Sequence, residues 1–260
     1  MRVLTLDTSG APISAAVAAD GRVDAFFYVR ANKTHAEGLM PCVNAILAEL
    51  GCDTGNFDAF AAVCGPGSFT GLRIGISAIK AFAYANRKKA VGISTLDALA
   101  YNIGDRPESY ICPVMDARNG NVYQAIYATD NALRAGSKNA PTGGGSRYPE
   151  NCGLKRLAAP ALLSVEQAAD RLIKLCGSDG GYKRIVFNGD AAQKYACSFR
   201  ELLPGVICDT AREPMLLQNA ASAALLACGA VSAGLGVPPE LLAPEYLNAG
   251  YAPVKKNASI

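Results

Sequence analysis

Two kinds of hydrophobic pattern alternate along the first hundred residues. Short apolar runs predict buried strands, whereas apolar residues three or four positions apart predict helices with one buried face. The clearest pair is an apolar run over 57–64 and a following helix whose apolar side carries Leu72, Ile76, Ile79 and Phe82. Strands are predicted over 2–6, 13–19, 23–29, 57–64 and 91–93, and helices over 34–51, 72–86 and 94–100.

The same order of elements begins again near residue 110. Asp7 and Asp116 end the first strand of each half and lie 109 residues apart, and the turn residues Asp20 and Asp130 lie 110 apart. Two related α/β halves are the simplest interpretation. In the second half, strands are predicted at 110–115 and 122–128, and 133–135 is a candidate for a third. The stretch 184–190 is predicted to hold a short strand, a glycine and the start of a helix. Further helices are predicted at 164–176, 195–203 and 218–233, and 136–151 is predicted to be a loop.

The stretch GPGSFTGLRIG, residues 65–75, joins the clearest strand to the clearest helix. Its glycines permit a tight turn and the close approach of another backbone or of an anion. One interpretation is a phosphate bound at the helix N-terminus. The other is packing or partner docking, because Gly71, Gly75 and Ala78 leave one helix face nearly bare. The spacing matches neither a dinucleotide-binding fingerprint nor a P-loop, which favours packing.

A carboxylate and two hydroxyls end the first predicted strand, at Asp7, Thr8 and Ser9. Together with Gly65 and the matching Asp116, they form a candidate nucleotide site that would face a phosphate or its metal ion. The alternative is that Asp7 caps the turn that follows it. The residues alone leave both interpretations open.

The charge balance excludes no broad class of partner. The chain has 260 residues, 50% of them hydrophobic, with 25 basic and 22 acidic side chains. This balance neither requires nor excludes nucleic acid, and no basic block resembles a binding arm. The longest basic run, 87–89, is predicted to be a solvated helix end that the helix dipole favours.

Cysteine and histidine usage narrows the class of protein further. Nine cysteines without a CxxC pair, and no signal peptide before the first strand, predict a reducing cytoplasm. The apolar tract 220–236 is rich in alanine, serine and glycine, which favours a buried helix over a membrane span. His35 is the only histidine, so a metal site built on two histidines of this chain is excluded.

A duplicated half with an aspartate at the end of its first strand resembles the actin, sugar-kinase and Hsp70 superfamily. Within it, the chain is similar to the TsaB (YeaZ) family, bacterial subunits in threonylcarbamoyladenosine modification of tRNA. The resemblance is carried by LTLDTSG, THAEGLMPCV, CGPGSFTGLRIGISAIKAFAYA, GISTLDALAY, PVMDARNGNVYQAIY and APEYLN.

This resemblance implies an α/β fold of duplicated actin-like, ribonuclease H-like lobes. Each lobe would hold a mixed five-stranded sheet flanked by helices. The implied division is a first lobe of residues 1–108 plus 213–236, a second lobe of 109–212, and an extended C-terminal segment of 237–260.

The resemblance also implies a role without catalysis. TsaD, the catalytic relative, carries two metal-binding histidines four residues apart, and Thr95 and Leu99 stand at the matching positions here. Neither side chain can replace an imidazole ligand. The implied role is a partner that supports a TsaD transferase in forming threonylcarbamoyladenosine at position 37 of tRNAs reading ANN codons. No catalytic residue, metal or cofactor is then expected in this chain alone.

The implied partner surface lies on two helices of the first half. A TsaE-like ATPase is expected to join the assembly, with ATP used by the complex and tRNA reached through it. Alone, the chain is expected to form a homodimer through the same surface, because association would remove an exposed apolar face from water. The predicted interface residues are His35, Leu39, Val43, Leu47, Thr70, Gly71, Ile74, Gly75, Ala78 and Phe82.

Two other functions fit the superfamily. An ATP-dependent phosphotransferase would use Asp7 and Asp116 around a metal–nucleotide complex. Analogy with relatives suggests a peptidase as well. The single histidine, and hence the absence of a pair of histidines that could bind a metal, argues against this function.

Overall fold

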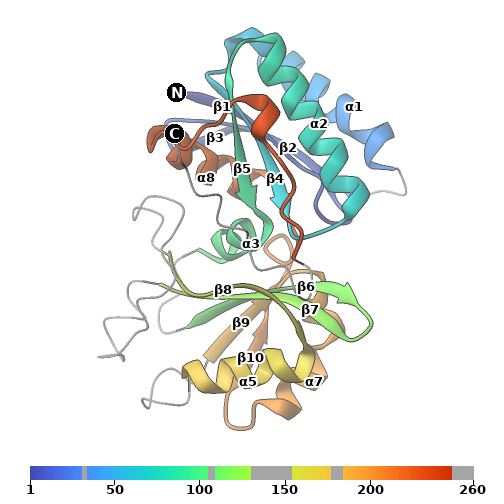
Figure 1. Cartoon of the computed structure of the whole chain (residues 1–260), viewed down its shortest axis with the longest axis vertical. Helices are drawn as coiled ribbons and strands as arrows, with labels where there is room; N and C mark the ends of the chain where they lie inside the picture. The colour runs from blue at the N-terminus through green and yellow to red at the C-terminus, as the bar shows by residue number, and fades with distance from the viewer. Residues whose placement is uncertain (31–33, 105–108, 130–153, 177–183, 248–260) are drawn as a thin grey trace, which may run out of the picture.

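The computed structural model describes residues 1–30, 34–104, 109–129, 154–176 and 184–247. These residues contain two five-stranded sheets, which are drawn one above the other in Figure 1. Helix α3, Thr95–Ile103, lies between the sheets in that view and contacts elements of both. We call the upper sheet with its helices the first lobe and the lower sheet with its helices the second lobe.

The first sheet has the strand order β3-β2-β1-β4-β5. β1 pairs antiparallel with β2 and parallel with β4, while β3 and β5 extend the two edges antiparallel and parallel, respectively. All five predicted strands of this half are confirmed, with ends close to the predicted ones. The strands are β1 Arg2–Asp7, β2 Ile13–Ala19, β3 Arg22–Val29, β4 Ala59–Gly65 and β5 Lys89–Ser94.

The second sheet repeats this arrangement, with the order β10-β9-β6-β7-β8. β6 pairs antiparallel with β7 and parallel with β9, as β1 does with β2 and β4. β8 and β10 take the antiparallel and parallel edges. The predicted duplication and the actin-like fold class are therefore confirmed. The strands are β6 Tyr110–Arg118, β7 Asn121–Thr129, β8 Leu154–Ser164, β9 Arg184–Asn188 and β10 Ile207–Thr210.

Helices cover both faces of each sheet. In the first lobe, α1 (His35–Glu49) and α2 (Phe69–Ala85) pack on one face and α8 (Ala220–Ser232) on the other. In the second lobe, α5 (Val165–Cys176) and α7 (Ala196–Leu202) cover one face, and α3 covers the other. Figure 1 shows α1 and α2 side by side on one flank of the first lobe, opposite α8.

Two of the predicted helix starts, at residues 34 and 164, are confirmed by side-chain caps. Thr34 Oγ1 accepts from Glu37 N at 3.3 Å, and the Glu37 carboxylate accepts from Thr34 N at 3.0 Å, a complete capping box. Ser164 Oγ accepts from Gln167 N at 3.2 Å in the same way at the start of α5. These side chains satisfy N–H groups that a helix leaves unpaired, so local sequence is enough to set the starts of these helices.

Among the described residues, the third strand of the second sheet is β8. Residues 133–135, predicted as a possible strand, and 136–151, predicted as a loop, lie outside the described residues. The third position is taken by β8, which was not predicted. Pro160 in its middle argues against a strand when only the sequence is considered. In the structure, however, this proline lies where the register between β8 and β7 shifts, and β8 is an edge strand. The N–H group that proline lacks therefore interrupts no regular ladder of hydrogen bonds.

The helix expected directly after Gly189 is present as α6, Asp190–Lys194. Strand β10 was not predicted, because its four residues are too few to show a hydrophobic period.

A buried ionic contact fastens α3 to the second lobe. Arg156 Nη2 on β8 lies 2.5 and 2.6 Å from the two carboxylate oxygens of Asp97 on α3. Tyr127 Oη on β7 donates to the same carboxylate at 2.6 Å. Burial and the Asp97 charge raise the pKa of Tyr127, which keeps its phenol protonated as a donor. This largely buried network and the apolar face of α3 thus both attach α3 to the second sheet.

The C-terminal segment returns along the first lobe. Val237 and Ala90 exchange two backbone hydrogen bonds, and Glu245 N donates to the Cys64 carbonyl at 2.7 Å. Beyond a short 3-10 helix, Pro239–Leu241, the Tyr246 ring stacks on Phe69 at 5.2 Å between centroids. Residues 237–247 therefore pack against α2 and the edge of the first sheet, as Figure 1 shows.

Candidate functional site

The turn after β1 carries the three candidate nucleotide residues Asp7, Thr8 and Ser9, and all three are buried. Asp7 Oδ1 accepts from Ser9 N at 2.9 Å and from Ser9 Oγ at 2.6 Å. The capping alternative that the sequence left open is therefore observed. Asp7 Oδ2 has no hydrogen-bond partner among the described residues, and burial raises the pKa of this carboxyl.

Replacing Asp7 with asparagine is expected to stabilise the protein at neutral pH by roughly 1–2 kcal/mol. The folded state binds a proton more readily than the unfolded state here, so the ionised wild-type side chain destabilises the fold above the raised pKa. As the pH falls through that pKa toward the usual aspartate range, the Asp7 carboxyl takes up a proton and the wild type becomes more stable relative to the variant. The difference in unfolding free energy between the two proteins therefore becomes smaller. Urea unfolding at neutral and acidic pH measures this.

Asp20→Asn is the matched control for that experiment. The Asp20 carboxylate is exposed and bonds the N-terminal ammonium at 2.7 Å, which lowers its pKa, so removing the charge there has the opposite sign. An Asp7→Asn variant less stable than the wild type at every pH would show that the buried charge is stabilising.

The glycines of the 65–75 stretch pack against this turn. A Cβ added to Gly71 would lie 2.1 Å from the Thr8 carbonyl oxygen, and one added to Gly75 would lie 2.5 Å from Thr8 Oγ1. Thr8 Oγ1 also donates to the Gly71 carbonyl at 2.7 Å. The bare helix face that the sequence predicted is real, but its close neighbour is the β1 turn of the same chain rather than a second helix.

The start of α2 is also engaged within the chain. Ser68 N donates to the Ser9 carbonyl at 2.8 Å, and Gly71 N donates to Ser68 Oγ at 3.2 Å. Gly65, the fourth candidate nucleotide residue, is buried with φ at +125°, and an added Cβ would lie 2.5 Å from the Glu245 carbonyl oxygen. Two N–H groups that an anion could have used are thus already bonded, which supports the packing interpretation.

A cleft of about 600 Å³ lies between the lobes beside this turn. Ser9 and Asp116, two of the five candidate nucleotide residues, line it from opposite lobes. Asp7, Thr8 and Gly65 lie behind its wall and do not line it. His35 also lines the cleft, with Nε2 2.8 Å from the Gly10 carbonyl oxygen.

Asp190 lines the second-lobe side of the cleft, and Lys194 contacts the lining residue Asp116; the sequence analysis singled out neither. Lys194 Nζ lies 2.7 Å from Asp116 Oδ2, and Asp190 Oδ1 accepts from Asp116 N at 2.8 Å. Burial raises the pKa of Asp190. The position of Asp190 in the repeat could have indicated it. Asp190 follows Gly189 at the end of the fourth strand of the second lobe, as Pro66 follows Gly65 at the end of the fourth strand of the first. The Asp116 carboxylate therefore already has a cation beside it.

The predicted partner surface separates into an interior and an exterior group. Leu39, Val43, Gly71 and Gly75 are buried within this chain, so a docked protein could not touch them without rearrangement. The remainder reach the surface at least partly: His35, Leu47, Thr70, Ile74, Ala78 and Phe82. Exposed apolar side chains that were not predicted extend this surface: Met40, Phe69 and Tyr84.

Thr95 and Leu99 both point into the protein interior. They lie on α3 between the lobes, and neither side chain is exposed. Within the described ranges, no cluster of three or more His, Cys, Asp or Glu side chains could hold a metal ion. Nor does any helix among these residues combine the length and apolar character needed to cross a bilayer.

Comparison with known protein families shows the family of this chain. Residues 29–236 match the family model described as TsaD, tRNA N6-adenosine threonylcarbamoyltransferase. The chain belongs to the TsaD family. The matched range contains α1, α2 and α3, and all of the residues that line the inter-lobe cleft except Ser9, Gly10 and Ala11.

Two curated relatives of the chain are named TsaB. The chain is 32% identical over 133 residues to the tRNA threonylcarbamoyladenosine biosynthesis protein TsaB of Bacillus subtilis, which covers 51% of this chain and 58% of the relative. For the Escherichia coli TsaB, the identity is 35% over 131 residues, covering 50% and 56%. The matches thus span less than two thirds of these curated relatives.

A solved structure matches the whole fold. YeaZ from Pseudomonas aeruginosa superimposes with a TM-score of 0.72 at 27% identity, covering 95% of this chain and 99% of that chain. Together with the TsaB matches, this confirms the resemblance to the TsaB (YeaZ) proteins that the sequence motifs indicated.

Proposed function

We propose that this chain is a non-catalytic subunit that binds and supports a TsaD-like transferase. The product of that complex would be threonylcarbamoyladenosine at position 37 of tRNAs reading ANN codons. The names of the TsaB relatives place those proteins in the biosynthesis of this nucleoside, which supports the proposal. A TsaE-like ATPase, ATP use by the complex, contact with tRNA through the complex, a homodimer of the free chain and a cytoplasmic location belong to the same proposal.

The observation that carries the proposal is the chemistry of α3. This chain has the TsaD family fold, but at the positions where the resemblance expects metal-binding histidines it has Thr95 and Leu99. Both are fully buried, and Leu99 lies in the apolar cluster that joins α3 to the second sheet. A buried hydroxyl and an isobutyl group provide packing, not metal ligation.

The surface of α1 and α2 is the proposed docking site. Ser77, Ala81 and Ala85 form an exposed row of small side chains along α2, and the exposed Phe69 and Tyr84 lie at its two ends. Small residues let a partner helix approach closely, while the aromatic side chains supply apolar area. The proposed contact therefore uses a different, exposed face of α2 from the one that carries Gly71 and Gly75.

An ATP-dependent phosphotransferase remains the second candidate, because the cleft brings Ser9, Asp116 and Asp190 together. The contacts within the chain favour it less. Asp116 is paired with Lys194, and Asp7 is held by Ser9 behind the wall. We therefore propose that the isolated chain holds no nucleotide.

Ala81→Arg is expected to weaken binding to a TsaD homologue at least tenfold. The arginine would project from an exposed position of α2 into the proposed contact, and it is compatible with the helix itself. Isothermal titration calorimetry with the purified partner measures the change. Gly75→Arg is unsuitable, since the clash with Thr8 would perturb the fold.

Ile173→Arg is the matched control, because Ile173 is an exposed residue on α5 of the second lobe. It should leave binding unchanged. Absence of any complex with the wild-type chain would refute the proposed function, and equal binding by the Ala81→Arg variant would refute the docking site.

A further inference from the structure

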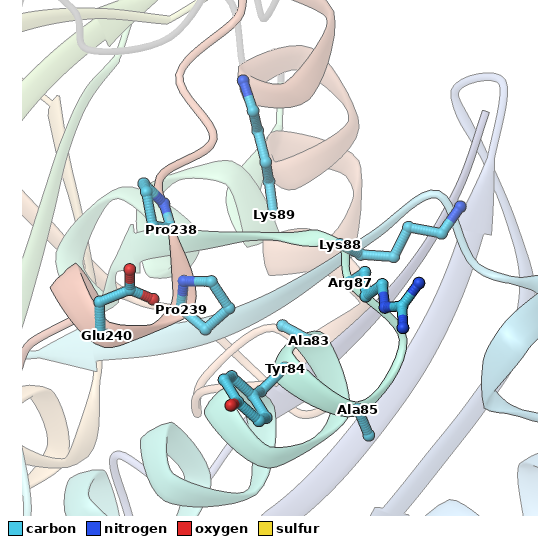
Figure 2. A pocket seen from close by; sticks show the side chains of 9 residues that line it. All are labelled: Ala83, Tyr84, Ala85, Arg87, Lys88, Lys89, Pro238, Pro239 and Glu240. Carbon is cyan, nitrogen blue, oxygen red and sulfur yellow. The ribbon is translucent and has the colours of Figure 1, made fainter.

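A basic pocket of about 610 Å³ lies at the C-terminal end of α2, away from the inter-lobe cleft. Its walls are the last turn of α2, the turn into β5 and residues 238–240 (Figure 2). Arg87, Lys88 and Lys89 line it, and Glu240 is the one acidic residue among the lining side chains. Tyr84 also lines it and is 79% exposed.

The helix end does not need these cations for its own stability. The N–H groups of Asn86, Arg87 and Lys88 donate to the carbonyls of Phe82, Tyr84 and Ala83, and Asn86 Nδ2 also donates to Phe82 O at 2.8 Å. Backbone and amide groups thus satisfy the last carbonyls, as in an ordinary helix C-cap. Among the ion pairs of the described residues, none includes Arg87, Lys88 or Lys89.

The directions of the three side chains fit an extended anion. Arg87 has a left-handed φ of 54°, which turns the chain sharply between helix and strand. Figure 2 shows Arg87 and Lys88 leaving this turn on one side and Lys89 on the other. A single phosphate could be bonded by only some of them, whereas successive phosphates of a nucleic acid backbone could meet each one. The exposed Tyr84 ring beside them offers a face on which a base can stack.

We propose that this pocket binds RNA, with Arg87, Lys88 and Lys89 on backbone phosphates and Tyr84 stacked on a base. The inference rests on the proposed function, which brings a tRNA to the complex. Ala85 belongs both to the pocket lining and to the exposed row on α2, so an RNA held by a docked partner could continue onto this pocket. The sequence analysis predicted only a solvated helix end here.

The test is the binding of a fluorescently labelled, unmodified tRNA transcript at increasing potassium chloride concentrations. Both the free chain and its complex with a TsaD homologue are measured. The triple variant Arg87→Gln, Lys88→Gln, Lys89→Gln is expected to bind at least tenfold more weakly, and to lower the slope of log affinity against log salt by about 2. Tyr84→Ala should weaken binding about fivefold or more without changing the slope.

The control triple variant Lys174→Gln, Arg184→Gln, Arg200→Gln removes the same charge from exposed positions of the second lobe and should bind like the wild type. Calorimetry with the TsaD homologue and no RNA separates the two proposals, because the triple variant of Arg87, Lys88 and Lys89 should keep wild-type association. Equal tRNA binding by both triple variants would overturn the RNA site. So would displacement of tRNA by polyglutamate as effectively as by unlabelled tRNA.

Discussion

Replacing Arg156 with alanine is expected to lower the free energy of unfolding by about 3–5 kcal/mol. The change leaves the Asp97 carboxylate, only 5% exposed, without its cation and with Tyr127 Oη as its remaining side-chain donor among the described residues. An uncompensated charge in a site of low dielectric is among the most destabilising single changes. Because the contact joins α3 to β8, the loss should also loosen the attachment of the two lobes. Urea denaturation followed by circular dichroism measures the effect.

The double variant Asp97→Ala, Arg156→Ala separates the pair from the packing around it. Removing both partners leaves no buried charge, so the double variant is expected to be more stable than Arg156→Ala alone. A double variant that loses the sum of the two single effects would mean that the two side chains do not interact, contrary to the 2.5 and 2.6 Å contacts.

Gly71→Ala is expected to destabilise the protein by about 3 kcal/mol. The new Cβ would lie 2.1 Å from the Thr8 carbonyl oxygen, a backbone atom that cannot rotate away. Alanine ordinarily favours a helix over glycine by about 1 kcal/mol, so the sign of the change is itself diagnostic. Thermal and urea unfolding of the purified variant measure it.

Gly75→Ala is the informative comparison, because its Cβ would meet the rotatable Thr8 side chain at 2.5 Å. Adding Thr8→Ala should relieve Gly75→Ala, whereas it cannot relieve Gly71→Ala. Ser77→Ala, exposed on the same helix, should change stability by less than about 0.5 kcal/mol. A stable Gly71→Ala protein would contradict the close packing of α2 against the β1 turn.

The first half of the fold could be predicted because its local signals agree. Apolar runs, the Thr34–Glu37 capping box and the Ser68 cap mark strands and helices that the structure contains at nearly the same bounds. The repeated aspartates Asp7 and Asp116 then revealed the duplication. Consistent signals at several levels are what make a fold readable from one sequence.

The missed elements have little local signal of their own. β8 contains Pro160 and is built mainly of leucine and alanine, residues that do not favour strands, so its pairing with β7 determines its conformation. β10 is a four-residue edge strand held parallel to β9. Such elements depend on long-range contacts that no short window contains.

The sequence predicted which residues end β1, but not which of them are exposed to the cleft. Asp7 and Thr8 were correctly placed at the end of β1, yet burial puts both behind the cleft wall. The glycine face of α2 was recognised, but whether a partner or the same chain covers it depends on tertiary packing. The pairing of Asp116 with Lys194 joins residues 78 positions apart, which sequence spacing cannot indicate.

The most direct test of the account is the formation of threonylcarbamoyladenosine on an unmodified tRNA, measured by mass spectrometry of the digested nucleosides. Every reaction contains ATP and a threonylcarbamoyl donor. One contains this chain alone, a second contains a TsaD homologue and a TsaE homologue, and a third contains all three proteins. The account predicts product only when this chain is combined with the other two. Product from this chain alone, or equal product without it, would contradict a supporting, non-catalytic role.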